Sequence, residues 1–201
     1  MKAYLFLIVF FILYSCTYME KKDQYHWDRV IVNKEIIKNN IFKKLDTQNE
    51  ILFPLEHRDT FIKKSCNISF YEGELSNYKN NKDISYYKCK AHFYQSDTLY
   101  ITIEYEDGFS SRGFIIKYKN NTFCTTINET TDMAFEVENN LQYFKTIYQK
   151  LTLDKSNYQM GDSIFGYINF KINEYNKDVC TTYNGKGYFK TKITKYLFVM
   201  P

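Results

Sequence analysis

The residues of this chain that could do chemistry are few, and histidine is the scarcest of them. The 201 residues include three histidines, His26, His57 and His92. His92 follows Cys89 at the spacing of a zinc-ligand pair (Cys89-Lys90-Ala91-His92). On a strand, however, residues three positions apart point to opposite faces of the sheet. A zinc ion also needs more ligands than this pair, and no second pair lies nearby, so we expect no metal site.

Two other arrangements could support hydrolysis. His57 and Cys66 could act as base and nucleophile if the thiol pKa were lowered and a third group oriented the base. Glu104 and Glu106 could act as paired carboxylates if they flanked a bond across a cleft. Both glutamates fall on one predicted strand, however, and the solvent-exposed face of an antiparallel sheet is the simpler interpretation of their spacing.

Longer catalytic motifs are missing from the sequence. It has no Gly-x-Ser-x-Gly elbow, no glycine-rich phosphate loop, no His-Glu-x-x-His and no Cys-x-x-Cys. We therefore expect no catalytic residues and no cofactor. A hydrolase that uses a carboxylate pair or a Cys/His pair is the alternative.

Tyrosines crowd one stretch of the chain, at Tyr86, Tyr87, Tyr94, Tyr100 and Tyr105. Aromatic platforms can bind sugars and proteins, but aromatic side chains in strands also fill the cores and edges of sheets. Because 20 Tyr and 17 Phe are spread through the whole chain, we interpret this group as packing.

The elements that must position these residues are short strands. Apolar or alternating segments predict strands at 51–55, 60–64, 66–72, 85–95, 98–106, 114–119, 122–128, 143–153, 163–172 and 185–193. Helical spacing predicts one short helix near 34–46. We expect a mainly β protein with an antiparallel β-sandwich-like fold, organised as a β-rich region at 25–135 and a C-terminal antiparallel β unit at 136–201. Residues 130–140 are the candidate boundary, and the two units could pack as one domain.

Two turns set the expected strand pairing in the middle of the chain. Asp107-Gly108 should open a turn that closes near Gly113, and Asn120-Asn121 should form the next turn. With this pairing, Lys117 or Lys119 would face Glu104 or Glu106 across the ladder.

The N-terminus has the pattern of a secretory signal. Lys2 precedes an apolar run from Ala3 to Leu13, interrupted only by Tyr4. A membrane-spanning helix needs about 20 apolar residues, and this run is shorter. The charged residues that follow, at 20–23, would cost free energy if they entered the hydrocarbon of a bilayer.

The end of this segment, Leu13-Tyr14-Ser15-Cys16, resembles the lipobox of bacterial lipoproteins. The resemblance implies that residues 1–15 are a cleaved signal peptide, that the Cys16 thiol receives a lipid, and that residues 16–24 form a lipidated tether. Tyr14 is larger than the residues usual at that position. Two or more acyl chains give stable anchoring, so we expect a protein of the cell envelope, lipid-anchored to the outer membrane and facing the periplasm or the cell surface. A signal peptide cut without lipidation is the alternative.

Four cysteines follow Cys16, at positions 66, 89, 124 and 180. An even number permits disulfides in an exported protein. Cys66 and Cys89 fall on consecutive predicted strands and are the first candidate pair. Free buried thiols are the alternative.

One further pattern bears on the fold. Tyr158-x-x-Gly161-Asp162-x-Ile164-x-Gly166 resembles the strand pairs of immunoglobulin-like and macroglobulin-like β-sandwich modules. In those modules a tyrosine precedes a Gly-Asp turn, and a glycine in the next strand allows close backbone approach. The resemblance implies a β-sandwich and no activity.

The net charge and the expected cellular location narrow the range of possible functions. The net charge of +4 is mild, and the charges are mixed in sign, so we expect no nucleic-acid partner. We expect a membrane-anchored lipoprotein that acts as a non-catalytic binding or envelope-assembly module, with the membrane and an envelope protein as its partners. An immunity-type lipoprotein that binds a toxin is an alternative.

Overall fold

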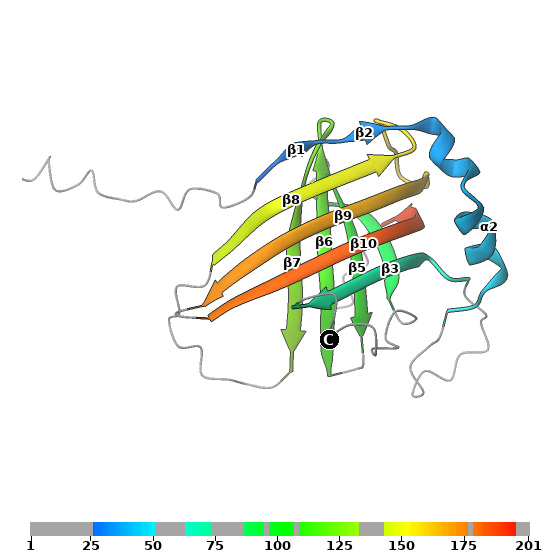
Figure 1. Ribbon diagram of the computed structural model, residues 1–201. Coiled ribbons are helices and arrows are strands. Elements are labelled where there is room, and N and C mark those ends of the chain that lie inside the picture. The colour runs from blue at the N-terminus through cyan, green and yellow to red at the C-terminus, as the bar shows by residue number, and fades with distance from the viewer. Residues whose placement is uncertain are drawn as a thin grey trace, which may run out of the picture.

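The structure is a computed structural model that describes residues 26–50, 63–73, 87–94, 97–106, 109–132, 143–176 and 179–195. Its elements, shown in Figure 1, are β1 (Asp28–Arg29), β2 (Ile31–Val32), the 3-10 helix η1 (Lys34–Lys38), α2 (Asn40–Thr47), β3 (Cys66–Glu72), β4 (Lys88–Tyr94), β5 (Thr98–Glu106), β6 (Ser110–Lys119), β7 (Thr122–Thr131), β8 (Tyr143–Leu153), β9 (Ser163–Asn176) and β10 (Val179–Thr194). The expected mainly β fold is confirmed.

The strands form one hydrogen-bonded sheet that folds over on itself. Its order is β1-β7-β6-β5-β4-β10-β9-β8-β2, and β3 pairs with β10. β4 to β7 pair antiparallel with one another, as do β3, β10, β9 and β8. Among the described strands, the two groups pair with each other through a short parallel ladder at Ile193↔Ala91 and Thr194↔His92. In Figure 1, β8, β9, β10 and β3 cross in front of the strands of the other layer, in a sandwich-like arrangement.

The first two strands, β1 and β2, connect the two layers along β7 and β8. β1 pairs with β7 of one layer, and β2, which begins two residues later, pairs with β8 of the other layer. The segment from Asp28 to Val32 therefore joins both layers.

The core lies between the layers because side chains alternate along each strand. Phe114 of β6 meets Phe170 of β9 with ring centroids 4.7 Å apart, and Phe70 of β3 lies 5.4 Å from Phe114. All three rings are buried, and each contributes roughly 2–3 kcal/mol through apolar burial. The regions 25–135 and 136–201 thus share one hydrophobic core.

The short helix expected near 34–46 is confirmed, but it consists of two pieces. Asn39 ends η1, and its side chain accepts a hydrogen bond from the Ile41 N–H at 3.0 Å, which caps the start of α2. Asparagine favours this capping position over a helix interior. Phe42 packs edge-on against Phe165 and Tyr188, so α2 covers one end of the outer face of β9 and β10. Among the residues that the structure describes, no helix is both long enough and apolar enough to span a bilayer.

The strands at 66–72, 98–106 and 143–153 have the predicted bounds, whereas β6, β9 and β10 are longer than predicted. The segments predicted at 51–55 and 60–64 lie almost wholly outside the described residues. Asn120 and Asn121 have φ values of 50° and 62°, so the predicted turn between β6 and β7 is confirmed.

β5 and β6 pair antiparallel, as predicted, but the expected register between them is wrong. β6 already begins at Ser110, so Gly113 lies inside the strand opposite Glu104, and Lys117 lies opposite Tyr100. The turn does not extend to Gly113. Neither Lys117 nor Lys119 therefore faces Glu104 or Glu106.

Candidate functional site

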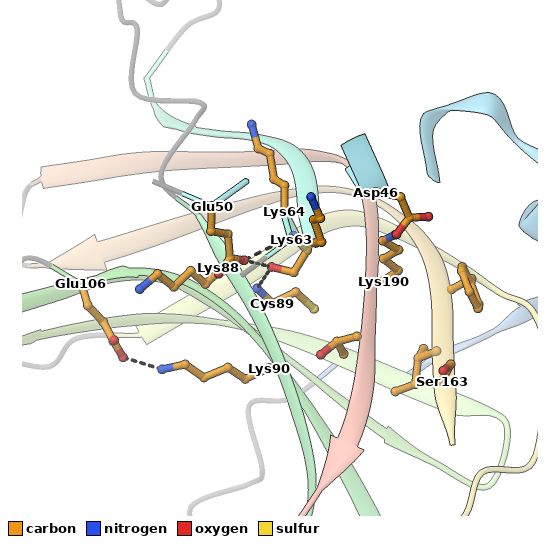
Figure 2. A pocket seen from close by; sticks show the side chains of 14 residues that line it. Asp46, Glu50, Lys63, Lys64, Lys88, Cys89, Lys90, Glu106, Ser163 and Lys190 are labelled. Carbon is orange, nitrogen blue, oxygen red and sulfur yellow. Dashed lines mark hydrogen bonds and ion pairs between the residues drawn. The ribbon is translucent and has the colours of Figure 1, made fainter. Parts of the chain in front are cut away.

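A cleft of about 700 Å³ opens where β4 and β10 separate beyond their short parallel contact. Figure 2 shows the side chains that line it, which come from α2 and the residues after it, the segment before β3, and the strands β4, β5, β9 and β10. Ten are labelled, namely Asp46, Glu50, Lys63, Lys64, Lys88, Cys89, Lys90, Glu106, Ser163 and Lys190. Five lysines and three carboxylates are among the lining residues, so the cleft is polar and mixed in charge.

The carboxylates of this cleft already have partners. Lys90 Nζ lies 2.8 Å from Glu106 Oε1, and Lys190 forms an ion pair with Asp46. Ser65 donates its hydroxyl to Glu50 and accepts a hydrogen bond from the Cys89 N–H at 2.9 Å. These contacts tie β3, β4, β10 and α2 together, which is a structural role.

Glu104 and Glu106 share the outer face of β5, as predicted, and both contact Lys90 of β4. Burial raises the pKa of Glu104, whose side chain is only 12% exposed, and Lys90 offsets this in part. Burial would also raise the pKa of Glu106, but the hydrogen bond and charge of Lys90 outweigh it and lower the pKa. Divergent carboxyl pKa values can serve acid–base catalysis. Here both carboxylates hold the same ammonium group on one strand face, so they do not flank a substrate bond.

Cys66 and Cys89 lie on consecutive strands, as predicted, and both are buried in the core. Cys66 Sγ donates to the Tyr87 carbonyl at 3.0 Å, and burial, with a smaller effect of Glu50, raises the pKa of its thiol to about 12. A thiol with this pKa is a poor nucleophile at neutral pH. The structure holds all four of these cysteines as free thiols, and Cys66 and Cys89 are close enough to interact electrostatically. Their disulfide stays a prediction, and His57 lies outside the described residues.

Cys89 and His92 point to opposite faces of β4. Cys89 faces the core, whereas the His92 ring stacks on Tyr100, 5.8 Å away, on the outer face. Burial lowers the pKa of His92. In the described part of the chain, no group of three or more His, Cys, Asp and Glu side chains could hold a metal ion.

The tyrosine group divides between core and surface. Tyr87 is buried and Tyr105 packs against the core, which confirms the packing interpretation for these two residues. Tyr94 and Tyr100 instead form a ring pair, 5.2 Å apart, on the outer side of β4 and β5. Tyr86 lies outside the described residues.

The outer face of β3, β10, β9 and β8 has a different character from the cleft. Its outward positions lie in register across the strands: Ser69, Lys186, Asn169 and Lys150 form one row, and Tyr71, Asn184, Lys171 and Tyr148 form the next. Lys145 and Tyr143 continue this face along β8. We call Lys145, Lys150, Lys171, Lys186, Tyr143 and Tyr148 the lysine–tyrosine face.

The lysines of this face lack partners. Within the described ranges, Lys145, Lys150, Lys171 and Lys186 make no hydrogen bond or ion pair. No outward position on these four described strands holds Asp or Glu. The whole chain has 27 Lys and Arg against 23 Asp and Glu, so the absence of carboxylates is local to this surface.

Sequence reasoning missed this face, although a signal for it was present. In β9, Lys171 alternates with the buried Phe170 and Ile172, and in β8, Lys150 precedes the buried Leu151. Outward lysines could therefore have been assigned strand by strand. Bringing them onto one surface required the strand order, in which β10 and β9 lie between β3 and β8.

Comparisons with protein-family models, with curated proteins and with solved structures found no match. The fold and the surface therefore define the class: a mainly β, two-layer protein with a basic, tyrosine-bearing face. Cys16 lies outside the described residues.

Proposed function

We propose that this chain is an exported lipoprotein, anchored through Cys16, whose β domain is a non-catalytic binding module of the cell envelope. The observation that carries the binding role is the lysine–tyrosine face, where unpartnered lysines lie beside Tyr143 and Tyr148, which are 43% and 47% exposed. A surface that segregates one sign of charge and displays aromatic side chains is suited to a partner of opposite charge.

The proposed location in the cell envelope rests on the N-terminal sequence. Lys2, the apolar run that ends at Leu13, and Cys16 match the order of parts in a lipoprotein signal. The groups considered for hydrolysis favour a structural role over catalysis, since the Cys66 thiol is protonated at neutral pH and the two glutamates hold one lysine.

Lipidation is tested by labelling cells with an alkyne analogue of palmitate and by intact mass of the extracted protein. We expect a membrane-bound species that begins at Cys16 and carries acyl groups, and we expect Cys16→Ser to abolish the label. Cys180→Ser, which removes an exposed thiol elsewhere, should label as strongly as the parent protein. Unchanged labelling of the Cys16→Ser variant would refute the anchor.

The binding role is tested by placing a photo-crosslinking residue at position 150 or, as a control on the outer side of the other layer, at position 117. Envelope adducts should form from position 150 and not from position 117. Equal yields from both positions would contradict binding through the lysine–tyrosine face.

A further inference from the structure

We propose that the lysine–tyrosine face rests on the anionic lipid headgroups of the membrane that holds the anchor. This inference rests on the proposed function and names the partner of that surface. Under it, the protein is attached at two points: the lipid on Cys16 and the outer face of β3, β10, β9 and β8.

Charge complementarity is the first argument. Lys186 and Lys150 lie in one row with Asn169 between them, so their strands are about 10 Å apart, and Lys171 lies in the next row. Without a carboxylate among them, these lysines can all face an anionic plane. Each lysine held near such a surface raises membrane affinity about fivefold.

The other layer lacks this property. On its outer face, Lys90 is neutralised by Glu104 and Glu106, and Lys119 pairs with Asp97. The molecule therefore has one face whose lysines have no carboxylate among them, and an opposite face on which lysines and carboxylates are mixed.

Exposed apolar side chains border the lysines and form the second argument. Tyr143, Ile147 and Tyr148 on β8 are 43%, 46% and 47% exposed, and Ile31 of β2, which pairs with Thr152 of β8, is 44% exposed. Tyrosine is enriched at the boundary between headgroups and hydrocarbon. Lysine can lay its apolar stem along such a boundary while its ammonium group stays in water.

The position of the tether is the third argument. The described chain begins at His26, and β2 then pairs with β8, the strand that carries the exposed Tyr143, Ile147 and Tyr148. The ten residues from Cys16 to Tyr25 span no more than about 35 Å even when fully extended. A lipid on Cys16 therefore holds this edge of the sheet within reach of the bilayer, where one anchor and a basic patch together give firmer attachment than either alone.

The test uses the mature, lipidated protein reconstituted in vesicles of phosphatidylcholine alone or of phosphatidylcholine with phosphatidylglycerol. Lysines are acetylated for a short time and the modified positions are quantified by mass spectrometry. Lys145, Lys150, Lys171 and Lys186 should react more slowly in the anionic vesicles than in the neutral ones. Lys117 and Lys119, on the other layer, should react at the same rate in both.

A matched pair of variants separates charge from anchoring. Lys150→Gln/Lys171→Gln/Lys186→Gln should lower the ratio of docked to undocked protein about a hundredfold and remove the protection of Lys145. Lys88→Gln/Lys117→Gln/Lys119→Gln removes the same charge from the other layer and should leave that protection intact. Both variants should remain in the vesicle fraction through their lipid.

Two results would overturn the inference and leave the proposed function standing: equal acetylation of the face lysines in both kinds of vesicle, or protection by an acidic polysaccharide or an envelope protein but not by anionic lipid. An extracted protein without acyl groups would instead refute the proposed anchor itself, and intact mass distinguishes that failure from the others.

Discussion

Gly166 shows how closely side chains pack at the residue scale. A Cβ atom at this position would lie 2.2 Å from Cζ of Phe189, a fully buried ring on the neighbouring strand. The sequence pattern had suggested close approach of two backbones here, but the glycine instead accommodates a ring. The same arrangement recurs at Gly185, which faces the ring of Phe170.

Gly166→Ala should therefore lower the free energy of unfolding by about 1–3 kcal/mol, the usual cost of overpacking a core. Urea denaturation measures it. Gly161→Ala is the control, because no atom lies within 4 Å of its Cβ but its φ of +88° makes any side chain unfavourable. Adding Phe189→Leu should recover part of the Gly166→Ala loss and none of the Gly161→Ala loss. Wild-type stability of Gly166→Ala would contradict the packing argument.

The cysteines should differ sharply in reactivity. Cys180 is exposed, whereas Cys66, Cys89 and Cys124 are buried. With a pKa of about 12, only about one Cys66 thiol in ten thousand is ionised at pH 8. A thiol reagent should therefore modify Cys180 first in the folded protein, as peptide mass mapping would show.

Unfolding without reductant then tests the predicted disulfide. If Cys66 and Cys89 are joined, only Cys124 and Cys180 become labelled, and reduction releases the other two thiols. Labelling of all four without reductant would show that the pair is free and that the disulfide prediction is wrong.

At the scale of elements, the connection between β8 and β9 is held by a compact polar network. Buried Asp154 accepts hydrogen bonds from the Tyr158 hydroxyl at 2.7 Å and from the Phe165 N–H at 3.0 Å. Burial, with the hydrogen bond to Asp154, raises the pKa of Tyr158. Asp162 Oδ2 lies 2.7 Å from Lys155 Nζ and accepts the Gln159 N–H at 2.9 Å. The residues of the Tyr158-to-Gly166 pattern therefore order this turn.

Asp162→Asn should destabilise the protein in a pH-dependent way. The hydrogen bond from Lys155, together with the Gln159 N–H, lowers the pKa of Asp162 below its ordinary value of 3.8. The folded state thus favours the ionised carboxyl, and this stabilisation is present above pH 3.8 and is lost as the pH falls through the lowered pKa. The Tm difference between the two proteins should be largest near neutral pH and shrink in acid. A difference that did not change with pH would contradict the ionic role of Asp162.

Clean alternation of apolar and polar residues made several strands predictable from sequence. Where this alternation is absent, a strand start and a register were predicted wrongly. In β5, Leu99, Ile101 and Ile103 are buried and the charged residues face outward, so its bounds were predicted correctly. β6 begins with Ser110-Ser111-Arg112, which carries no apolar signal, so its start was placed too late and the pairing with β5 was displaced. The candidate surface was less predictable, because it depends on which strands are neighbours and not on any one strand.

At the scale of the whole molecule, one side chain links the segment from His26 to Asn33 to both layers. We call this segment, which closes the sheet, the closing segment. Gln149 of β8 accepts the Thr125 N–H of β7 at 2.9 Å and donates to the His26 carbonyl at 2.7 Å. The segment itself is held by backbone hydrogen bonds from Val30 to Asn121 and from Asn33 to Leu153. Under the proposed function this segment also follows the tether, so any pull on the anchor would reach both layers through it.

Gln149→Leu should open this closure before the rest of the fold. Leucine is similar in size but leaves the partly buried Thr125 N–H without its partner, at a cost of about 1–3 kcal/mol, and it releases the exposed His26 carbonyl to water. Because Gln149 holds the closing segment to the sheet, the amide of Val30 should exchange with solvent about 5–150-fold faster, whereas the amide of buried Ile168 should be affected less. Gln159→Leu makes the same chemical change at an exposed position where only the backbone N–H is used, and it should leave both exchange rates unchanged. Equal acceleration at Val30 and Ile168 would mean that the closing segment opens only when the whole sheet unfolds.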